Sequence, residues 1–153
     1  MRFIYVAAFI GVLAAPSPIV SAQSSGQPLM EVYKSPTCGC CSKWVEHVRQ
    51  HGFTARVTDL TDQAALDALK TKHGVPRTAQ SCHTALIGGY AIEGHVPAAE
   101  VKRLLKEKPA VAGIAVAGMP AGSPGMEVPG RSQAYNVIAF DKKGDSRVFA
   151  SYR

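Results

Sequence analysis

Apolar and polar residues alternate with different periods along the chain, and the changes of period predict strands separated by helices. Residues 29–33 and 53–60 alternate between apolar and polar, as strands do. Between these two runs, the apolar residues recur at helical spacing, and Gly52 ends this helix. The apolar positions of this intervening helix are Cys41, Trp44, Val45 and Val48. A second helix is expected to begin at a cap on Thr61 and to stop at residues 74–76, where glycine and proline break it.

The middle of the chain predicts a hairpin followed by a third helix. Residues 77–82 show no period, whereas residues 84–87 and 90–92 form two short strands about a Gly88–Gly89 turn. Pro97 suits the first turn of the helix that follows. The resulting order, βαβα–ββα, is the α/β order of thioredoxin and glutaredoxin folds, in which a CxxC motif follows the first strand.

The last part of the chain departs from this order. Residues 110–130 are so rich in glycine and proline that we expect a loop without regular structure. Residues 135–140 and 147–152 are strand-like runs on either side of a polar turn, which predicts a C-terminal β-hairpin. Because the length of the chain is enough for one hydrophobic core but not for two, residues 29–153 are expected to form a single thioredoxin-like domain.

The N-terminal residues are organised like an export signal. Arg2 gives a positive start, residues 3–15 are apolar, and small residues up to Ala22 predict cleavage there, followed by a polar linker over residues 23–28. The alternative is a membrane anchor, but the apolar run is too short to cross about 30 Å of hydrocarbon. We therefore expect residues 1–22 to be a signal peptide and the mature protein to be periplasmic, with no membrane span.

The distribution of charge narrows the classes of partner. The chain carries 17 Lys+Arg against 11 Asp+Glu, a formal charge of +6, but the basic residues are scattered and have few aromatic neighbours. Nucleic-acid-binding surfaces concentrate lysine and arginine in patches. A basic exported protein that does not bind nucleic acid is therefore the preferred interpretation.

Three of the four cysteines stand within four positions, Cys38-Gly39-Cys40-Cys41. Cys38 and Cys41 form a CxxC motif at the start of a predicted helix, where the N–H groups and the helix dipole stabilise a thiolate, both a nucleophile and a soft-metal ligand. Exported proteins favour disulfides, but this spacing closes almost no loop, so chemistry is favoured over a structural framework. In a dithiol catalyst, the extra thiol of Cys40 would form a competing disulfide. In a copper site, the same thiolate could bridge several Cu(I) ions.

The fourth cysteine, Cys82, stands just before the third predicted strand. In thioredoxin-like folds this position faces the CxxC motif and usually carries a cis-proline, but the nearest preceding proline here is Pro76. We infer that a ligand replaces the proline. The alternative is that Cys82 is a buried core residue, as lone cysteines often are.

The histidines offer further candidate ligands. His47 and His51 are spaced to chelate a metal, but they fall on the polar side of the first helix, which favours a solvated face. His83 is expected to point away from Cys82, because neighbours on a strand face opposite ways, unless the backbone there is irregular. His95 precedes a helix and is either a ligand or a turn residue.

Two methionines, Met119 and Met126, lie in the loop that is rich in glycine and proline. Thioether sulfur prefers Cu(I) to zinc, whereas methionine also fills gaps in cores. A loop of this composition offers little core to fill. Both roles, ligand and packing residue, remain open from the sequence.

Four segments together resemble a known family. They are Ser35-Pro36-Thr37-Cys38-Gly39-Cys40-Cys41, Ser81-Cys82-His83-Thr84-Ala85, Gly89-Tyr90-Ala91-Ile92-Glu93-Gly94-His95-Val96-Pro97 and residues 118–127. The combination is similar to the CopG-like family of bacterial periplasmic metal-binding proteins. The resemblance implies a thioredoxin-like fold, a copper cluster on the cysteines and a role in copper resistance beside export pumps. The ligands that it implies are Cys38, Cys40, Cys41, Cys82, His95 and Met119.

Three functions follow from these residues. The first is a periplasmic copper-binding protein that holds Cu(I) on thiolates, interconverts Cu(I) and Cu(II), and meets copper-export or copper-carrier proteins. The second is a thiol–disulfide oxidoreductase with Cys38 as nucleophile and Cys41 as resolving thiol. The third is a structural zinc protein with four thiolate ligands. Cys40 counts against the second function, and a methionine ligand would count against the third.

Overall fold

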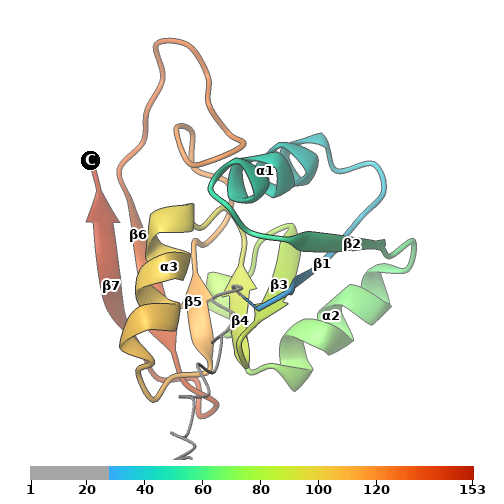
Figure 1. Ribbon diagram of the computed structural model, residues 1–153, viewed down its shortest axis with the longest axis vertical. Helices are drawn as coiled ribbons and strands as arrows, with labels where there is room; N and C mark the ends of the chain where they lie inside the picture. The colour runs from blue at the N-terminus through green and yellow to red at the C-terminus, as the bar shows by residue number, and fades with distance from the viewer. Residues whose placement is uncertain (1–27) are drawn as a thin grey trace, which may run out of the picture.

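The computed structural model describes residues 28–153, so the predicted signal peptide lies outside the described residues. One seven-stranded sheet runs through the molecule in the order β2-β1-β3-β4-β5-β6-β7 (Figure 1). Its strands are β1 (Met30–Lys34), β2 (Ala55–Asp59), β3 (His83–Ile87), β4 (Tyr90–Glu93), β5 (Gly113–Ala115), β6 (Tyr135–Phe140) and β7 (Ser146–Tyr152). The helices are α1 (Gly39–Gln50), α2 (Gln63–Lys72) and α3 (Ala98–Glu107), with a 3-10 turn at Arg77–Ala79.

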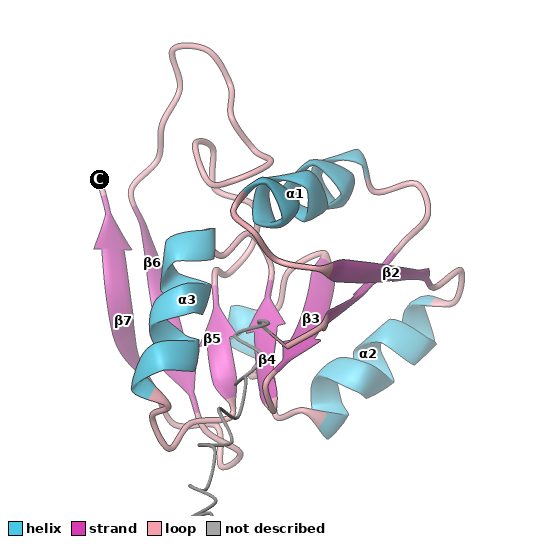
Figure 2. Ribbon diagram, viewed as in Figure 1, coloured by secondary structure: helices cyan, strands magenta, loops and turns pink. Residues whose placement is uncertain are grey.

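The strand pairing explains how the cysteine segments meet. β1 lies parallel to β2 and antiparallel to β3, so the end of β1, which leads into α1, lies beside the start of β3. Lys34 on β1 is opposite His83 on β3. β6 and β7 form the predicted C-terminal hairpin at the edge of the sheet opposite to β2 (Figure 2). The α/β class predicted from the sequence is confirmed.

Helices cover both faces of the sheet. The larger apolar core joins α1 and α3 to one face through Trp44, Val48, Val101 and Leu104. α2 meets the opposite face, where Lys70 reaches Thr84 of β3. Within residues 28–153, no helix has the length and apolar character needed to cross a membrane.

Two sequence predictions about the elements are wrong. The cap of α2 is Asp62 rather than Thr61, and its carboxylate accepts the Ala64 N–H at 2.9 Å. The segment 110–130 is not all loop, because β5 pairs parallel with β4 inside it. Gly113 allows this pairing, since a Cβ there would collide with the backbone of Ala91. A three-residue strand that begins at glycine leaves no alternation to detect.

His47 is not the solvated residue that the sequence suggests. It is half-buried, and its Nε2 accepts the backbone N–H of Ala98, the first residue of α3, at 3.1 Å. The preceding Pro97 provides no side-chain cap, so a histidine of α1 caps α3. Burial and the neighbouring His51 lower the pKa of His47, and Glu127 opposes them. His51 is exposed, as expected.

This cap predicts a pH dependence of stability. Because folding lowers the pKa of His47 below its ordinary 6.5, its contribution is complete above that pH and is lost as the pH falls below it. His47→Gln keeps an acceptor but does not titrate, so its unfolding free energy should fall less steeply below pH 6.5 than that of the wild type. Urea titrations of both proteins between neutral and mildly acidic pH measure the two slopes. Equal slopes for the two proteins would show that titration of His47 does not cause the pH dependence of stability.

Candidate metal centre

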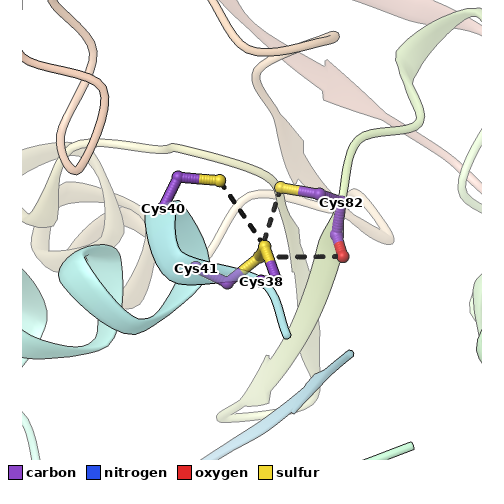
Figure 3. A group of neighbouring side chains, drawn as sticks. All are labelled: Cys38, Cys40, Cys41 and Cys82. Atoms are coloured by element: carbon purple, nitrogen blue, oxygen red, sulfur yellow. Dashed lines mark hydrogen bonds between the residues drawn. A yellow bond between two sulfur atoms is a disulfide. The ribbon is translucent and has the colours of Figure 1, made fainter. Parts of the chain in front are cut away.

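The four cysteines meet where the start of α1 approaches the segment before β3 (Figure 3). Cys38 is the N-cap of α1, Cys40 and Cys41 belong to its first turn, and Cys82 directly precedes β3. The four Sγ atoms all lie within 4.8 Å of one another. Two segments that are far apart in the sequence therefore supply one sulfur cluster.

Two of these sulfurs are bonded to each other. Cys38 and Cys41 form a disulfide, whereas Cys40 and Cys82 are free thiols. The Sγ of Cys40 lies 3.5 Å from that of Cys38, and the Sγ of Cys82 lies 3.4 Å from that of Cys41. Each sulfur of the disulfide thus has a thiol beside it (Figure 3). This arrangement suits thiol–disulfide exchange, and it suits metal bridging once the disulfide is reduced.

Cys82 faces the CxxC motif, as the sequence predicted. Its side chain is half-buried, and burial, followed by the charge of Cys40, raises the pKa of its thiol to about 11. A bound cation would reverse this effect, because a coordinating thiol loses its proton to the metal. The site therefore disfavours a free thiolate at Cys82 but not a coordinated one.

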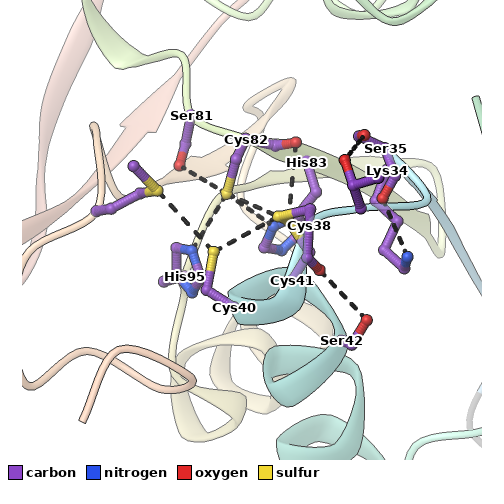
Figure 4. Close-up of a disulfide and its surroundings, with 12 residues drawn as sticks. Lys34, Ser35, Cys38, Cys40, Cys41, Ser42, Ser81, Cys82, His83 and His95 are labelled. Carbon is purple, nitrogen blue, oxygen red and sulfur yellow. Dashed lines mark hydrogen bonds between the residues drawn. A yellow bond between two sulfur atoms is a disulfide. The ribbon is translucent and has the colours of Figure 1, made fainter. Parts of the chain in front are cut away.

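His95 is buried and points at Cys82 (Figure 4). Its Nε2 lies 3.2 Å from the Sγ of Cys82, and its Nδ1 lies 2.8 Å from the carbonyl oxygen of Pro124. Because a carbonyl only accepts, Nδ1 carries the proton and Nε2 presents its lone pair to the cluster. Metal-bound histidines are oriented in the same way. Burial lowers the pKa of His95, although Pro124 and Glu127 act in the opposite direction.

His83 also joins this group. The chain bends at Cys82, the irregularity that was required for both side chains to reach one site. The Nδ1 of His83 lies 3.6 Å from the Sγ of Cys82, and its ring contacts those of Trp44 and His95 at centroid distances of 4.4 and 5.2 Å. Burial is the main reason that the pKa of this fully buried histidine lies well below its usual value, with His95 and two lysines adding to it.

The two methionines differ in their placement. Met119 is 52% exposed, and its thioether sulfur lies 4.0 Å from the Sγ of Cys40. Met126 contributes backbone hydrogen bonds to Ser123 and Gly122. Within the described residues, the thioether that makes a hydrogen-bond contact with a cysteine of the cluster is that of Met119, not that of Met126. The structure therefore brings Met119, and not Met126, to the edge of the centre.

The loop that carries Met119 passes close to α1 (Figure 1). Gly125 makes this approach possible, since a Cβ on it would lie 2.7 Å from the carbonyl oxygen of Cys40 and 2.9 Å from the amide nitrogen of Trp44. On the other side, the hydroxyl of Ser81 donates to the carbonyl oxygen of Gly118. The loop is thus attached to both cysteine segments, which explains how a region without regular structure holds a residue at the centre.

A buried ion pair lies behind the Cys82 segment. The ammonium of Lys70 on α2 donates to the carboxylate of Glu93 on β4, and both side chains are almost fully buried. Glu93 also accepts the Ser81 N–H at 2.7 Å and the Thr84 hydroxyl at 2.6 Å. Because Ser81 and Thr84 lie on either side of Cys82 and His83, the carboxylate holds this segment through a backbone N–H on one side and a side-chain hydroxyl on the other.

The donor set fits copper. Thiolate and thioether sulfur suit Cu(I), and imidazole nitrogen also accepts Cu(II). Around one ion with bonds of about 2.0–2.3 Å, neighbouring ligand atoms stand roughly 3.3–3.9 Å apart. The separations of 3.2–3.6 Å from Cys82 to Cys41, His83 and His95 are of that size. The residues can therefore enclose a metal ion with small adjustments once the disulfide is reduced.

Comparisons with known proteins agree with this chemistry. A family model described as "Protein of unknown function, DUF411" matches residues 79–126. Two solved structures named Copper resistance protein copG, Form 1 and Form 2, are similar at 40% and 42% sequence identity, with TM-scores of 0.75 and 0.74. The matches cover 82% and 83% of this chain and 98% and 99% of those chains. No curated protein matches the chain.

Proposed function

The chain belongs to the CopG family of copper resistance proteins, and from this premise we propose that it binds Cu(I) on its cysteine cluster and contributes to copper resistance. The observation that carries the proposal is the approach of four sulfur atoms to within 4.8 Å of one another. Sulfurs this close can bridge more than one Cu(I). A zinc site would use four thiolates but would leave the thioether of Met119 without a purpose.

Each ligand has a distinct part in the proposal. In the reduced chain, Cys38, Cys40 and Cys41 offer thiolates from the start of α1, and Cys82 completes the cluster from the segment before β3. The remaining ligands, from the edge of the cluster, are His95 and Met119. The sulfurs favour Cu(I), and the imidazole accommodates Cu(II). Interconversion would use the Cys38/Cys41 pair, because its oxidation from dithiol to disulfide releases two protons to solvent and the two electrons that reduce two Cu(II) to two Cu(I).

We also propose a cellular location and partners for the chain. Because residues 1–22 have the pattern of an export signal, we propose that they are cleaved and that the mature chain acts in the periplasm. The mass of the exported chain tests this, since it should begin at Gln23 and not at Met1. The partners that we propose are copper ions and the periplasmic copper-export or copper-carrier proteins that deliver or remove them. The exposed position of Met119 suits such a transfer, because this residue lies at the surface beside the cluster.

The disulfide supports a second candidate, a thiol–disulfide oxidoreductase. Cys40→Ala and Cys38→Ala separate the two functions. Cys40→Ala removes a bridging sulfur but leaves the Cys38/Cys41 dithiol whole, whereas Cys38→Ala destroys the dithiol. If copper binding is the function, both variants should lower the copper tolerance of cells, and the wild-type protein should reduce insulin-type disulfides poorly, more poorly still with Cu(I) bound.

The measurement is growth of a deletion strain that carries each variant over a series of copper concentrations, with little oxygen so that Cu(I) persists. Ser42→Ala is the matched control, because Ser42 is an exposed residue in the same turn of α1 and its hydroxyl donates to the carbonyl oxygen of Cys38 rather than to a sulfur. Full tolerance in Cys40→Ala together with loss in Cys38→Ala, and disulfide turnover that follows the same order, would favour the oxidoreductase.

A further inference from the structure

We propose that Cys82, His83 and His95 form a second metal-binding set within the centre, a Cys-His-His site that remains complete when Cys38 and Cys41 are joined as a disulfide. The inference rests on the proposed function, because it assigns a second ligand set to the same centre. It adds His83 as a ligand and Cys82 as the sulfur that the two sets share. The oxidation state of the CxxC pair then selects which set is available.

The three ligand atoms already converge. The Sγ of Cys82 lies 3.2 Å from Nε2 of His95 and 3.6 Å from Nδ1 of His83, and all three atoms lie within 4.8 Å of one another. Ligand atoms around one copper or zinc ion stand roughly 3.3–3.9 Å apart. The bend at Cys82 is what turns two consecutive residues toward the same point.

The two imidazoles are held in orientations that suit ligands. His95 donates its Nδ1 proton to the carbonyl of Pro124, which leaves Nε2 with a lone pair directed at Cys82. The ring of His83 is fully buried between Trp44 and His95. Its Nε2 has no hydrogen-bond partner within the described residues, so no contact requires the proton to stay on Nδ1. The polar contact of this buried ring is the approach of its Nδ1 to the Cys82 thiol, and a metal ion shared by these two atoms would leave the proton of the ring on Nε2.

The disulfide separates this set from the rest of the cluster. With Cys38 bonded to Cys41, two of the four sulfurs are no longer thiolates, whereas Cys82 and both imidazoles are unaffected. One thiolate with two imidazoles accepts Cu(II) more readily than an all-sulfur cluster does. The reduced chain therefore offers a sulfur-rich set for several Cu(I) ions, and the disulfide form offers a mixed set for a single ion.

The test uses Co(II), a spectroscopic probe that does not oxidise thiols under anaerobic conditions. The protein is the disulfide form of Cys40→Ser, in which Cys82 is the single remaining thiol, so only Cys82 can produce a thiolate-to-Co(II) charge-transfer band. We expect this band at one Co(II) per chain. His83→Gln in the same background should weaken Co(II) binding at least tenfold, since loss of an outer partner alone costs roughly 10–100-fold. His73→Gln, which changes a histidine at the end of α2, should leave the binding unchanged.

A second measurement does not depend on any change at His83. In the same Cys40→Ser protein labelled with ¹⁵N-histidine, Zn(II) should shift the Nδ1 resonance of His83 and the Nε2 resonance of His95. Unchanged binding in His83→Gln, or a His83 Nδ1 resonance that does not respond to Zn(II), would overturn the inference. Because the proposed function is tested with Cu(I) on the fully reduced chain, a protein that binds several Cu(I) ions but gives no Co(II) band refutes only this second set.

Discussion

Replacing Lys70 with methionine is expected to lower the free energy of unfolding by about 3–5 kcal/mol, the cost of leaving a buried charge without its partner. Glu93 is fully buried, and Lys70 is its only cation within hydrogen-bond distance among the described residues. Burial already raises the pKa of Glu93, and Lys70 is the main opposing influence. Without Lys70, the pKa of Glu93 rises further.

The sign of the pH dependence distinguishes this cause from loss of packing. A carboxyl whose pKa is raised by folding binds a proton more tightly in the native state, so the Lys70→Met variant should recover stability as the pH falls. Lys70→Met with Glu93→Gln should recover part of the loss at neutral pH, because the amide is uncharged and its oxygen can still accept the Ser81 N–H. Urea denaturation measures all three proteins. A loss below about 1 kcal/mol, or one that is independent of pH, would show that the pair is unimportant for stability.

Cys82→Ser is expected to reduce copper binding while the protein stays folded. Serine is nearly isosteric, and Cys82 lies at the edge of the core rather than inside it. Its sulfur is the only one contributed by the segment before β3, and it lies within reach of both the cysteines of α1 and His95. Losing a direct ligand should weaken Cu(I) binding by more than the roughly 10–100-fold that follows from loss of an outer partner.

Competition with a Cu(I) chelator under anaerobic conditions measures this effect on reduced protein. Ser42→Ala provides the comparison, because its hydroxyl lies near the same turn of α1 but bonds only to the carbonyl of Cys38. Circular dichroism and thermal unfolding establish that each variant is folded. If Cys82→Ser folds normally and binds as many Cu(I) ions as tightly as the wild type, Cys82 is a core residue and the four-sulfur cluster is wrong.

The sequence predicts local elements well where periodicity is strong. α1 has a clear apolar stripe that includes Cys41 and Trp44, and both are fully buried. β5 was missed because it has three residues and begins at Gly113, and neither alternation nor β-propensity can develop over that length. The cap of α2 was misplaced by one residue, since Thr61 and Asp62 are both good caps and only the backbone geometry chooses between them.

The candidate centre is predicted less evenly. The proximity of Cys82 to the CxxC motif follows from the order of the strands. The inclusion of His83 depends on a bend that the residue types do not reveal, because alternation along a regular strand would separate it from Cys82. The sequence does contain a sign that Lys70 and Glu93 are buried. Lys70 lies one helical turn after the buried Leu66, and Glu93 is the last residue of an apolar strand. Neither charge, however, identifies the other as its partner without the fold.

The number of Cu(I) ions bound by the fully reduced chain tests the central claim most directly. Titration against a competing chelator, without oxygen, should show saturation at more than one Cu(I) per chain, because four sulfurs within 4.8 Å of one another can bridge ions. Cys40→Ser should bind fewer ions than the wild type, since it removes a bridging sulfur next to Met119. Saturation at a single Cu(I), with the same number and affinity in Cys40→Ser, would contradict the account.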